Sequence, residues 1–141
     1  MVLFVVHCFV SCCLEIVLFI VFVCVFRHPG VTINSILKEC KRENYLKDLR
    51  INQRIASDVW NLQYRHILDI HRKYGDWCFV HYDQILNGDG FKRIQNITGA
   101  EINHQFPDCN LKRSYELAID SNDVMDTYKE LCNLASYFDH G

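Results

Sequence analysis

The sequence predicts a helix-rich α/β fold, and three observations lead to that prediction. Residues 17–26 form an uninterrupted apolar run of mostly β-branched and aromatic side chains, which is typical of a strand buried on both faces of a parallel sheet. Residues 77–82 are a second, shorter apolar and aromatic run that follows Gly75 and reads as another buried strand. Between and after these runs, apolar residues recur with helical spacing.

The N-terminal residues 2–26 contain one formal charge, Glu15, and support more than one interpretation. About 20 apolar residues are enough to span a bilayer, so one interpretation is a single transmembrane helix. Glu15 near its centre would then cost about 2.5–3.5 kcal/mol, and the basic residues that follow would place the C-terminal side in the cytoplasm. The corresponding function is a membrane-anchored protein with a helical cytoplasmic interaction domain.

The soluble interpretation places the protein in the cytoplasm, with residues 2–10 as a buried element, a break at 11–15 and a strand at 17–26. The high density of β-branched residues favours it. The chain then divides into an apolar N-terminal segment, residues 1–16, and a domain at residues 17–141. A third interpretation takes the first dozen residues as an accidental start after the loss of an upstream part. An exposed apolar segment or sheet edge would favour self-association.

Four segments are predicted to be helices, namely residues 31–43, 49–73, 91–97 and 121–138. The second is the longest, and we expect its apolar stripe to face the core. That stripe consists of Ile51, Ile55, Val59, Leu62, His66 and Ile70, and it is flanked by Trp60, Ile67 and Leu68. His66 and His71 are five residues apart and would not share a helix face, which argues against a two-histidine metal site. Residues 83–86 read as a turn.

The composition excludes several classes of function. The formal net charge is −2, so general nucleic-acid binding is not expected and any basic site must be local. The eight cysteines form no C-x-x-C pair and no Cys/His set with zinc-finger spacing. We therefore expect reduced cysteines in a cytosolic protein, and no metal site.

One pair of residues has the chemistry of a phosphate site. Arg27 ends the first apolar run, Pro29 and Gly30 turn the chain, and Ser35 follows on the predicted helix. Open α/β sheets bind ligands at the carboxyl ends of their strands. A guanidinium there and a hydroxyl on the next helix can converge on one phosphate, because the guanidinium supplies paired charge-assisted donors and the hydroxyl adds another.

Residues 22–29, FVCVFRHP, together with Ser35, resemble the second nucleotide-binding motif of the sulfotransferase family. In that family an apolar strand ends in Arg, a Pro often follows two residues later, and a Ser lies eight residues after the Arg. The resemblance implies that Arg27 and Ser35 hold the 3′-phosphate of PAPS (3′-phosphoadenosine 5′-phosphosulfate), the sulfuryl donor, or of 3′,5′-ADP. It also implies a partial three-layer parallel-sheet fold like the P-loop-like sulfotransferase core.

Looser matches extend the resemblance over about residues 17–114. Residues 77–86 resemble the segment in which a strand runs into an aromatic-Tyr-Glu/Asp stretch, which implies that Tyr82 lies beside the adenine. Residues 110–114 resemble a late basic loop of the family, which implies that Lys112 and Arg113 lie near the nucleotide.

Two parts of a sulfotransferase are missing from the sequence. The loop Pro-x-x-Gly-Thr/Ser-Thr/Ser, which holds the 5′-phosphosulfate in that family, is absent, and His7 and Glu15 upstream of Arg27 lie in no recognisable motif. Sulfuryl transfer needs an activated acceptor, stabilisation of the leaving phosphate and alignment of both. We therefore expect a truncated or degenerate sulfotransferase that is inactive alone, with no assigned catalytic residue and no identified acceptor.

Overall fold

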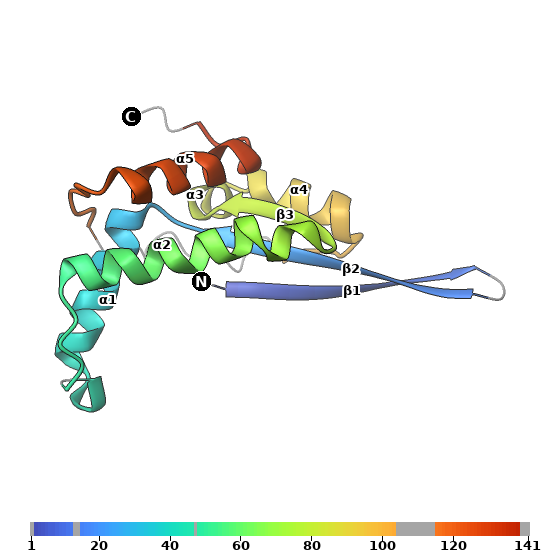
Figure 1. The fold of residues 1–141 in the computed structure, drawn as a ribbon. Coiled ribbons are helices and arrows are strands. Elements are labelled where there is room, and N and C mark those ends of the chain that lie inside the picture. Colours follow the sequence, from blue (N-terminus) through green and yellow to red (C-terminus); the bar gives the residue numbers. More distant parts are fainter. Residues whose placement is uncertain (1, 13–14, 47, 104–114, 139–141) are drawn as a thin grey trace.

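The computed structural model describes residues 2–12, 15–46, 48–103 and 115–138, with side chains from Ile20 onward. This part of the chain has an α/β fold with a three-stranded sheet in the order β1-β2-β3 (Figure 1). Strands β1 (Val2–Cys12) and β2 (Glu15–Phe26) are antiparallel, whereas β2 and β3 (Asp76–His81) are parallel. The sheet is mixed because a short connection permits only an antiparallel return, while a parallel one needs a crossover of a dozen or more residues.

Strand β2 includes the whole of the predicted strand and begins two residues earlier, at Glu15. The transmembrane interpretation requires a helix in this stretch. Of the helices that the structure describes, none combines the length and the apolar character needed to cross a membrane.

Helix α1 (Pro29–Arg42) begins directly after β2 because His28 caps it. Nδ1 of His28 accepts a hydrogen bond from the backbone N–H of Gly30 at 3.2 Å. Pro29 occupies the first turn, where its missing N–H removes no helical hydrogen bond. The helix therefore starts before its apolar spacing becomes visible in the sequence. A short 3-10 helix, η1 (Asn44–Leu46), follows it.

Helix α2 (Gln53–Asp69) is shorter than the predicted helix at residues 49–73. Asn52 starts it as an N-cap, since its Oδ1 accepts a hydrogen bond from the backbone N–H of Ile55 at 2.9 Å. A separate 3-10 helix, η2 (His71–Lys73), replaces the predicted last turn.

The predicted orientation of α2 is wrong. Ile55, Val59 and Leu62 of the predicted core stripe are 42%, 53% and 72% exposed. The buried face instead carries Trp60 and Tyr64, which are 1% and 3% exposed. Both faces of this helix are apolar, and the face with the two large aromatic rings buries more apolar area against the sheet.

Strand β3 passes directly into helix α3 (Tyr82–Leu86), where a turn was predicted. His81 caps α3, because its Nδ1 accepts from the backbone N–H of Asp83 at 3.2 Å. Oε1 of Gln84 accepts from the backbone N–H of His81 at 2.9 Å, which completes a capping box. Helices α4 (Asp89–Thr98) and α5 (Asn122–Ala135) follow and agree with the predicted segments to within a few residues.

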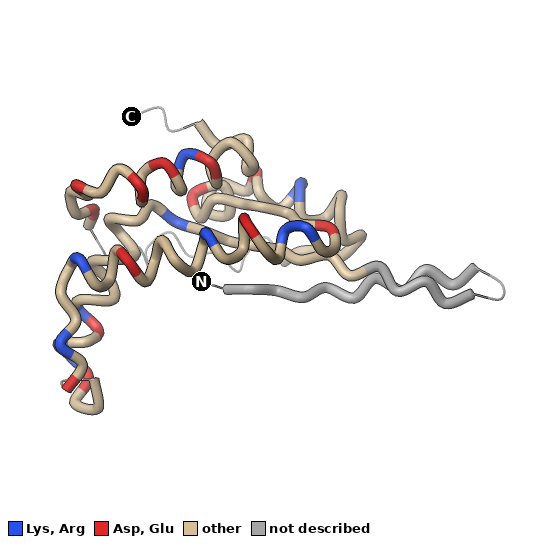
Figure 2. Tube along the Cα trace, viewed as in Figure 1, with Lys and Arg blue, Asp and Glu red and all other residues tan. Residues whose placement is uncertain are grey.

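Helices cover both faces of the parallel strand pair. On one face Cys24, Phe26 and Phe79 pack with the buried residues of α2 and α5. On the other face Val23, Cys78 and Val80 form a smaller cluster, against which Ile85 of α3 and Ile94 of α4 pack. In the part of the chain that Figure 2 colours by charge, most of the charged residues lie on the surrounding helices. The strands are therefore buried as the sequence predicts, and their carboxyl ends meet at one edge.

Candidate functional site

A cavity of ≈ 200 Å³ lies at the carboxyl ends of β2 and β3. Phe26 and His81, the last residues of the two strands, are paired in the sheet, so the residues that follow them come together. This is the edge at which open α/β sheets bind ligands. The cavity is lined by Arg27, His28, Val31, His81, Asp83, Glu116, Tyr128 and Tyr137.

Arg27 and Tyr82, two of the predicted site residues, are in contact. The guanidinium carbon of Arg27 lies over the Tyr82 ring, 4.8 Å from its centroid, in a cation–π arrangement. Nη2 of Arg27 is buried and has no hydrogen-bond partner among the residues that the structure describes. Leaving a buried donor unsatisfied costs about 1–3 kcal/mol, so this nitrogen is suited to an acceptor supplied by a ligand.

Ser35 lies on α1 at an exposed position and does not line the cavity. Val31, which does line it, is one helical turn before Ser35, so the two residues share a helix face. The structure thus places Ser35 one turn beyond the cavity rather than against Arg27. Lys112 and Arg113, the other predicted site residues, lie outside the described residues.

The described segment that follows Arg113 in sequence runs along α1. The carbonyl oxygen of Tyr115 accepts a hydrogen bond from Nδ2 of Asn34 at 2.7 Å. A Cβ on Gly30 would come within 2.2 Å of the carbonyl oxygen of Leu117, so this close approach requires glycine. The segment therefore lies against the first turns of α1, beside the cavity.

His28 joins this segment to the cavity wall. Its Nδ1 accepts from Gly30, so Nε2 carries the ring proton and faces Oε1 of Glu116 at 3.2 Å. The side chain of His28 is 15% exposed and that of Glu116 is 62% exposed. The Glu116 carboxylate thus has a hydrogen-bond donor beside it at the mouth of the cavity.

A buried cluster of aromatic side chains forms the opposite wall. His81 is 1% exposed, and its ring stacks on that of Tyr137 with the centroids 3.8 Å apart. Nε2 of His81 lies 3.3 Å from the hydroxyl of Tyr128, and the hydroxyl of Tyr137 donates to Oδ2 of Asp83 at 3.3 Å. The second carboxylate of the cavity therefore also has a donor facing it.

Sequence reasoning missed the contributions of Asp83, Glu116, Tyr128 and Tyr137 to this cavity. They come from three separate parts of the chain, and only the fold brings them to Arg27. The sequence signal for Tyr128 was its place on the apolar face of the last helix, which does not distinguish a core tyrosine from a cavity residue.

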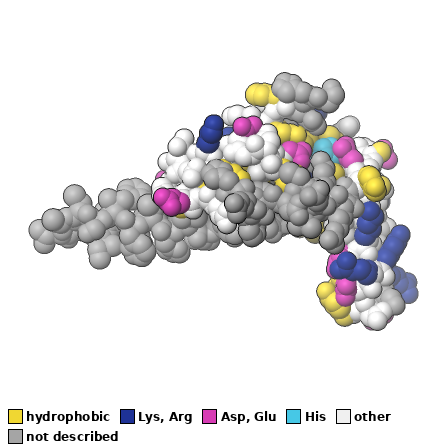
Figure 3. All heavy atoms as spheres, turned by 180° about the vertical axis from the view of Figure 1, so that it is seen from behind, with side chains coloured by type: hydrophobic (Ala, Val, Ile, Leu, Met, Phe, Trp, Pro, Cys, Tyr) yellow, Lys and Arg dark blue, Asp and Glu magenta, His cyan; other side chains and the backbone are white. Residues whose placement is uncertain are grey.

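The exposed basic residues of α1 lie away from the cavity. Lys38, Lys41 and Arg42 occupy the second half of the helix, and Figure 3 shows basic side chains gathered over this arm of the molecule. Nη2 of Arg42 donates to Glu39 at 2.6 Å and its Nε donates to Glu43 at 3.0 Å. Arg42 is thus already paired with carboxylates, whereas Nη2 of Arg27 has no acceptor among the described residues.

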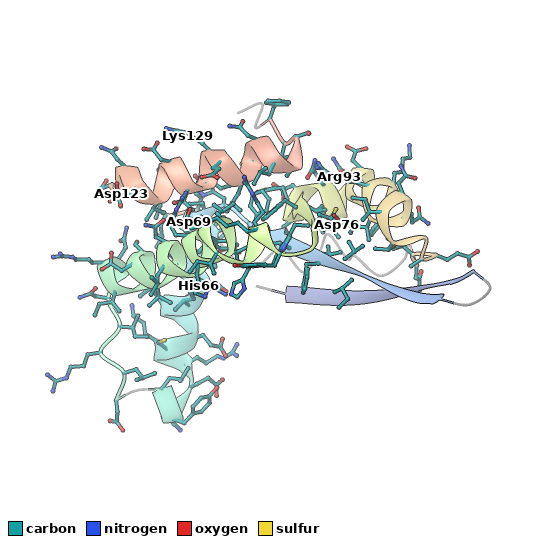
Figure 4. All side chains as sticks on the ribbon, turned by 45° about the vertical axis from the view of Figure 1, so that its right-hand side comes forward. His66, Asp69, Asp76, Arg93, Asp123 and Lys129 are labelled. Atoms are coloured by element: carbon teal, nitrogen blue, oxygen red, sulfur yellow. The ribbon has the colours of Figure 1, made fainter. Side chains whose placement is uncertain are left out.

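A second, larger cavity lies near the start of β3. Its volume is ≈ 830 Å³, and it is lined by Phe22, Val59, Leu62, Gln63, His66, Ile67, His71, Tyr74 and Trp77. The rings of Phe22 and Trp77 stack with centroids 4.8 Å apart. We call this cavity the apolar groove. Part of its wall is the outward apolar face of α2, and His66 lies on the side of α2 away from α5 (Figure 4).

His66 and His71 do not share a helix face, in line with their spacing, but their rings are in contact. Their ring centroids are 4.6 Å apart in an edge-to-face arrangement, because α2 ends at Asp69 and η2 redirects the chain. Within the described ranges there is no group of three or more His, Cys, Asp or Glu side chains that could hold a metal ion.

No disulfide joins the four cysteines that the structure describes, namely Cys24, Cys40, Cys78 and Cys132. Burial raises the pKa of Cys24 to about 12, and burial also raises the pKa of Cys78. These two thiols are therefore protonated and unreactive at neutral pH, as expected of cysteines that serve as small apolar core residues.

No protein-family model, no curated protein and no solved structure matches this chain.

Proposed function

We propose that the Arg27 cavity binds the 3′-phosphate of an adenine nucleotide, PAPS or 3′,5′-ADP, within a partial sulfotransferase-like fold. The observation that carries this proposal is the buried Nη2 of Arg27, which has no acceptor among the described residues and lies at the carboxyl end of a parallel strand. A phosphate oxygen would be a charged acceptor for this nitrogen, and hydrogen bonds between charged groups are the stronger kind.

The size of the cavity is consistent with a phosphate group rather than a whole nucleotide. Sites that enclose a drug-sized molecule measure about 300–1,000 Å³. The Arg27 cavity, at ≈ 200 Å³, suits the phosphate and part of its sugar. The adenine would then lie outside it, on the side of Tyr82, whose ring supports the Arg27 guanidinium.

Three further residues would act at the mouth of the cavity. Ser35, one turn beyond Val31, would reach a phosphate oxygen that projects along α1. Lys112 and Arg113 would add positive charge to a cavity whose wall includes the carboxylates of Asp83 and Glu116. Those carboxylates oppose an anion, so the added charge favours binding.

We expect nucleotide binding without sulfuryl transfer. The sequence contains no Pro-x-x-Gly-Thr/Ser-Thr/Ser loop for the 5′-phosphosulfate and no base within a motif upstream of Arg27. The Arg27 cavity would stabilise one end of the leaving nucleotide, whereas transfer also requires alignment of the sulfuryl group with an activated acceptor.

The proposal is tested by calorimetric titration with 3′,5′-ADP and with 5′-AMP, which lacks the 3′-phosphate. We expect the wild type to prefer 3′,5′-ADP, and Arg27→Met to weaken its binding at least about tenfold, because a charge-assisted hydrogen bond contributes about 1.5–3 kcal/mol. The matched control is Arg42→Met, which removes the same charge from the far end of α1. Equal affinity of wild type and Arg27→Met for 3′,5′-ADP, or equal affinity for the two nucleotides, would contradict the proposal.

A further inference from the structure

We infer that α2 is an interface between two copies of this chain, whose α2 helices pair in antiparallel orientation about a two-fold axis opposite Leu62. This inference goes beyond the proposed function, because the residues of α2 do not line the Arg27 cavity. The partner is a second copy of the chain, because the charges beside the outward face of α2 complement one another under two-fold symmetry.

The outward face of α2 is apolar and exposed. Ile55, Val59 and Leu62 recur on it with helical spacing, and Leu62 is 72% exposed. We call these three residues the outer stripe. Tyr74, which follows η2 and lines the apolar groove beside the stripe, is also exposed. Apolar side chains gathered in one exposed patch favour contact with another protein surface, because association removes them from water.

Leu62 lies opposite the buried side of the helix. Trp60 and Tyr64 face the core, and each residue of an α-helix is rotated by about 100° from the one before, so Leu62 between them points outward. Leu62 is also near the middle of α2, which runs over Gln53–Asp69. A two-fold axis opposite Leu62 therefore brings the outer stripes of two copies together along most of their length.

The charges beside the outer stripe match when the two helices are antiparallel, because residues equally far from Leu62 in opposite directions then face each other. Asp58 lies four residues before Leu62 and Arg65 three after it, so Asp58 of one copy meets Arg65 of the other with an axial offset of about 1.5 Å. Arg54 and Asp69, eight residues before and seven after, match in the same way. Two-fold symmetry produces each of these contacts twice.

These charged residues share one flank of the outer stripe. Asp69 lies on the side of α2 toward α5 (Figure 4), and Nη1 of Arg65 on that side donates to Oε2 of Glu130 at 2.7 Å. The helical repeat places Asp58, two turns before Arg65, on the same flank. Within one copy, Asp58 forms no ion pair with another residue that the structure describes. A two-fold axis brings the α5-side flanks of both copies together, so Asp58 gains a cationic neighbour.

The charges also select between the two possible orientations of the helix pair. In a parallel pair identical residues lie opposite each other, so Asp58 would meet Asp58 and Arg65 would meet Arg65. Juxtaposed like charges disfavour an interface, whereas the antiparallel pair joins opposite charges at the same positions. The apolar side agrees with the antiparallel register, because Val59, three residues before Leu62, meets His66, four residues after it.

The oligomeric state of the full chain, measured by sedimentation equilibrium, tests this inference. We expect a reversible dimer, and Leu62→Glu should weaken it at least about tenfold, because two carboxylates then meet at the axis. Leu62 is exposed in a single copy, so this substitution should leave the fold intact. The matched control is Ile97→Glu, at an exposed apolar position of α4 on the other face of the sheet, which should leave the dimer unchanged.

Two charge substitutions test the antiparallel orientation. Asp58→Lys and Arg65→Glu each place like charges at both symmetry-related contacts, so each variant alone should form dimers about tenfold more weakly. An equimolar mixture of the two variants should recover the dimer, because every contact in the mixed pair joins opposite charges. In a parallel pair, Asp58→Lys would exchange one repulsion for another and leave dimer formation unchanged.

Several outcomes would overturn the inference. These are a wild type that stays monomeric at every concentration, a dimer that Leu62→Glu leaves intact, and an equal loss in Leu62→Glu and Ile97→Glu. Failure of the mixture to recover, with Arg65→Glu folded by thermal unfolding, would contradict the antiparallel pairing. If Arg65→Glu does not fold, Asp58→Lys decides alone, since a dimer as stable as the wild type would contradict the pairing. Binding of 3′,5′-ADP is a separate measurement, so the proposed function stands or falls independently.

Discussion

The two cavities of this molecule differ in size and in chemistry. The apolar groove is about four times as large as the Arg27 cavity, ≈ 830 Å³ against ≈ 200 Å³. Its wall is mainly apolar and aromatic, and the nitrogen of Trp77 that could meet a ligand already donates to the carbonyl oxygens of His71 and Tyr74. The Arg27 cavity gathers a cation, two carboxylates, two histidines and two tyrosines.

This difference shows that volume and function are separate properties of a cavity. The groove is large because α2 is apolar on both sides and buries only one of them. The Arg27 cavity is small because four segments close around it, and each supplies polar side chains. Specific recognition depends on a few convergent polar groups, which the smaller cavity has.

The largest expected effect is a loss of stability, without a loss of nucleotide affinity, when the apolar groove is altered. Trp77→Ala removes a ring that stacks on Phe22 and lines the groove, so we expect it to lower the free energy of unfolding by about 3 kcal/mol. The dissociation constant for 3′,5′-ADP should stay the same, because the Arg27 cavity lies at the other end of the strands. Chemical denaturation and calorimetry measure the two quantities. If Trp77→Ala also weakened the binding of 3′,5′-ADP, the apolar groove and the Arg27 cavity would be coupled.

The second prediction concerns the close approach beside the Arg27 cavity. In Gly30→Ala the new methyl group would meet the Leu117 carbonyl at 2.2 Å, so residues 115–119 must move away from α1. Such overpacking costs about 1–3 kcal/mol, and the displaced Glu116 should also change the affinity for 3′,5′-ADP.

The control for Gly30→Ala is Gly88→Ala. Gly88 has φ 87° with open space around it, so its substitution costs stability through backbone strain alone. Thermal unfolding and titration of both variants are the measurements. A change in affinity for Gly88→Ala, or none for Gly30→Ala, would contradict the placement of the segment.

The smallest expected effect is a gain in affinity for 3′,5′-ADP. Glu116→Gln keeps an oxygen to accept from His28 and removes a negative charge from the mouth of the cavity. We expect about fivefold tighter binding of 3′,5′-ADP, because Glu116 is largely exposed and two unit charges about 4 Å apart in water interact by about 1 kcal/mol. Glu101→Gln, at an exposed position that does not line the cavity, serves as the control. Weaker binding in Glu116→Gln would show that the carboxylate supports the site.

The sequence predicted the elements that have strong local signals. A continuous apolar run ending at Arg27 was enough to identify β2, and the turn at Pro29 and Gly30 located the start of α1 closely. Helix α3 was missed because a five-residue helix is too short to show apolar periodicity. Its sequence signal was the pair His81 and Gln84, in which histidine takes the place of the usual serine or threonine of a capping box.

The candidate site was predictable only in part. Arg27 and Tyr82 each follow directly from a strand, so local pattern located them, and the structure places them in contact. The other walls of the cavity depend on which side of α5 faces the sheet and on where residues 115–119 lie. Helical spacing could not decide the orientation of α2 either, because two stripes of this helix are apolar and only packing against a partner distinguishes them.

The two apolar sides of α2 have a consequence for how its sequence can change. A helix with one apolar face can pack on a sheet in only one orientation, whereas α2 could pack in two. The large buried rings of Trp60 and Tyr64 determine which of the two orientations forms. Substituting smaller apolar residues for Trp60 and Tyr64 would allow α2 to rotate and to pack its other apolar face against the sheet. Side-chain bulk, more than hydrophobicity, therefore decides which half of the helix turns inward.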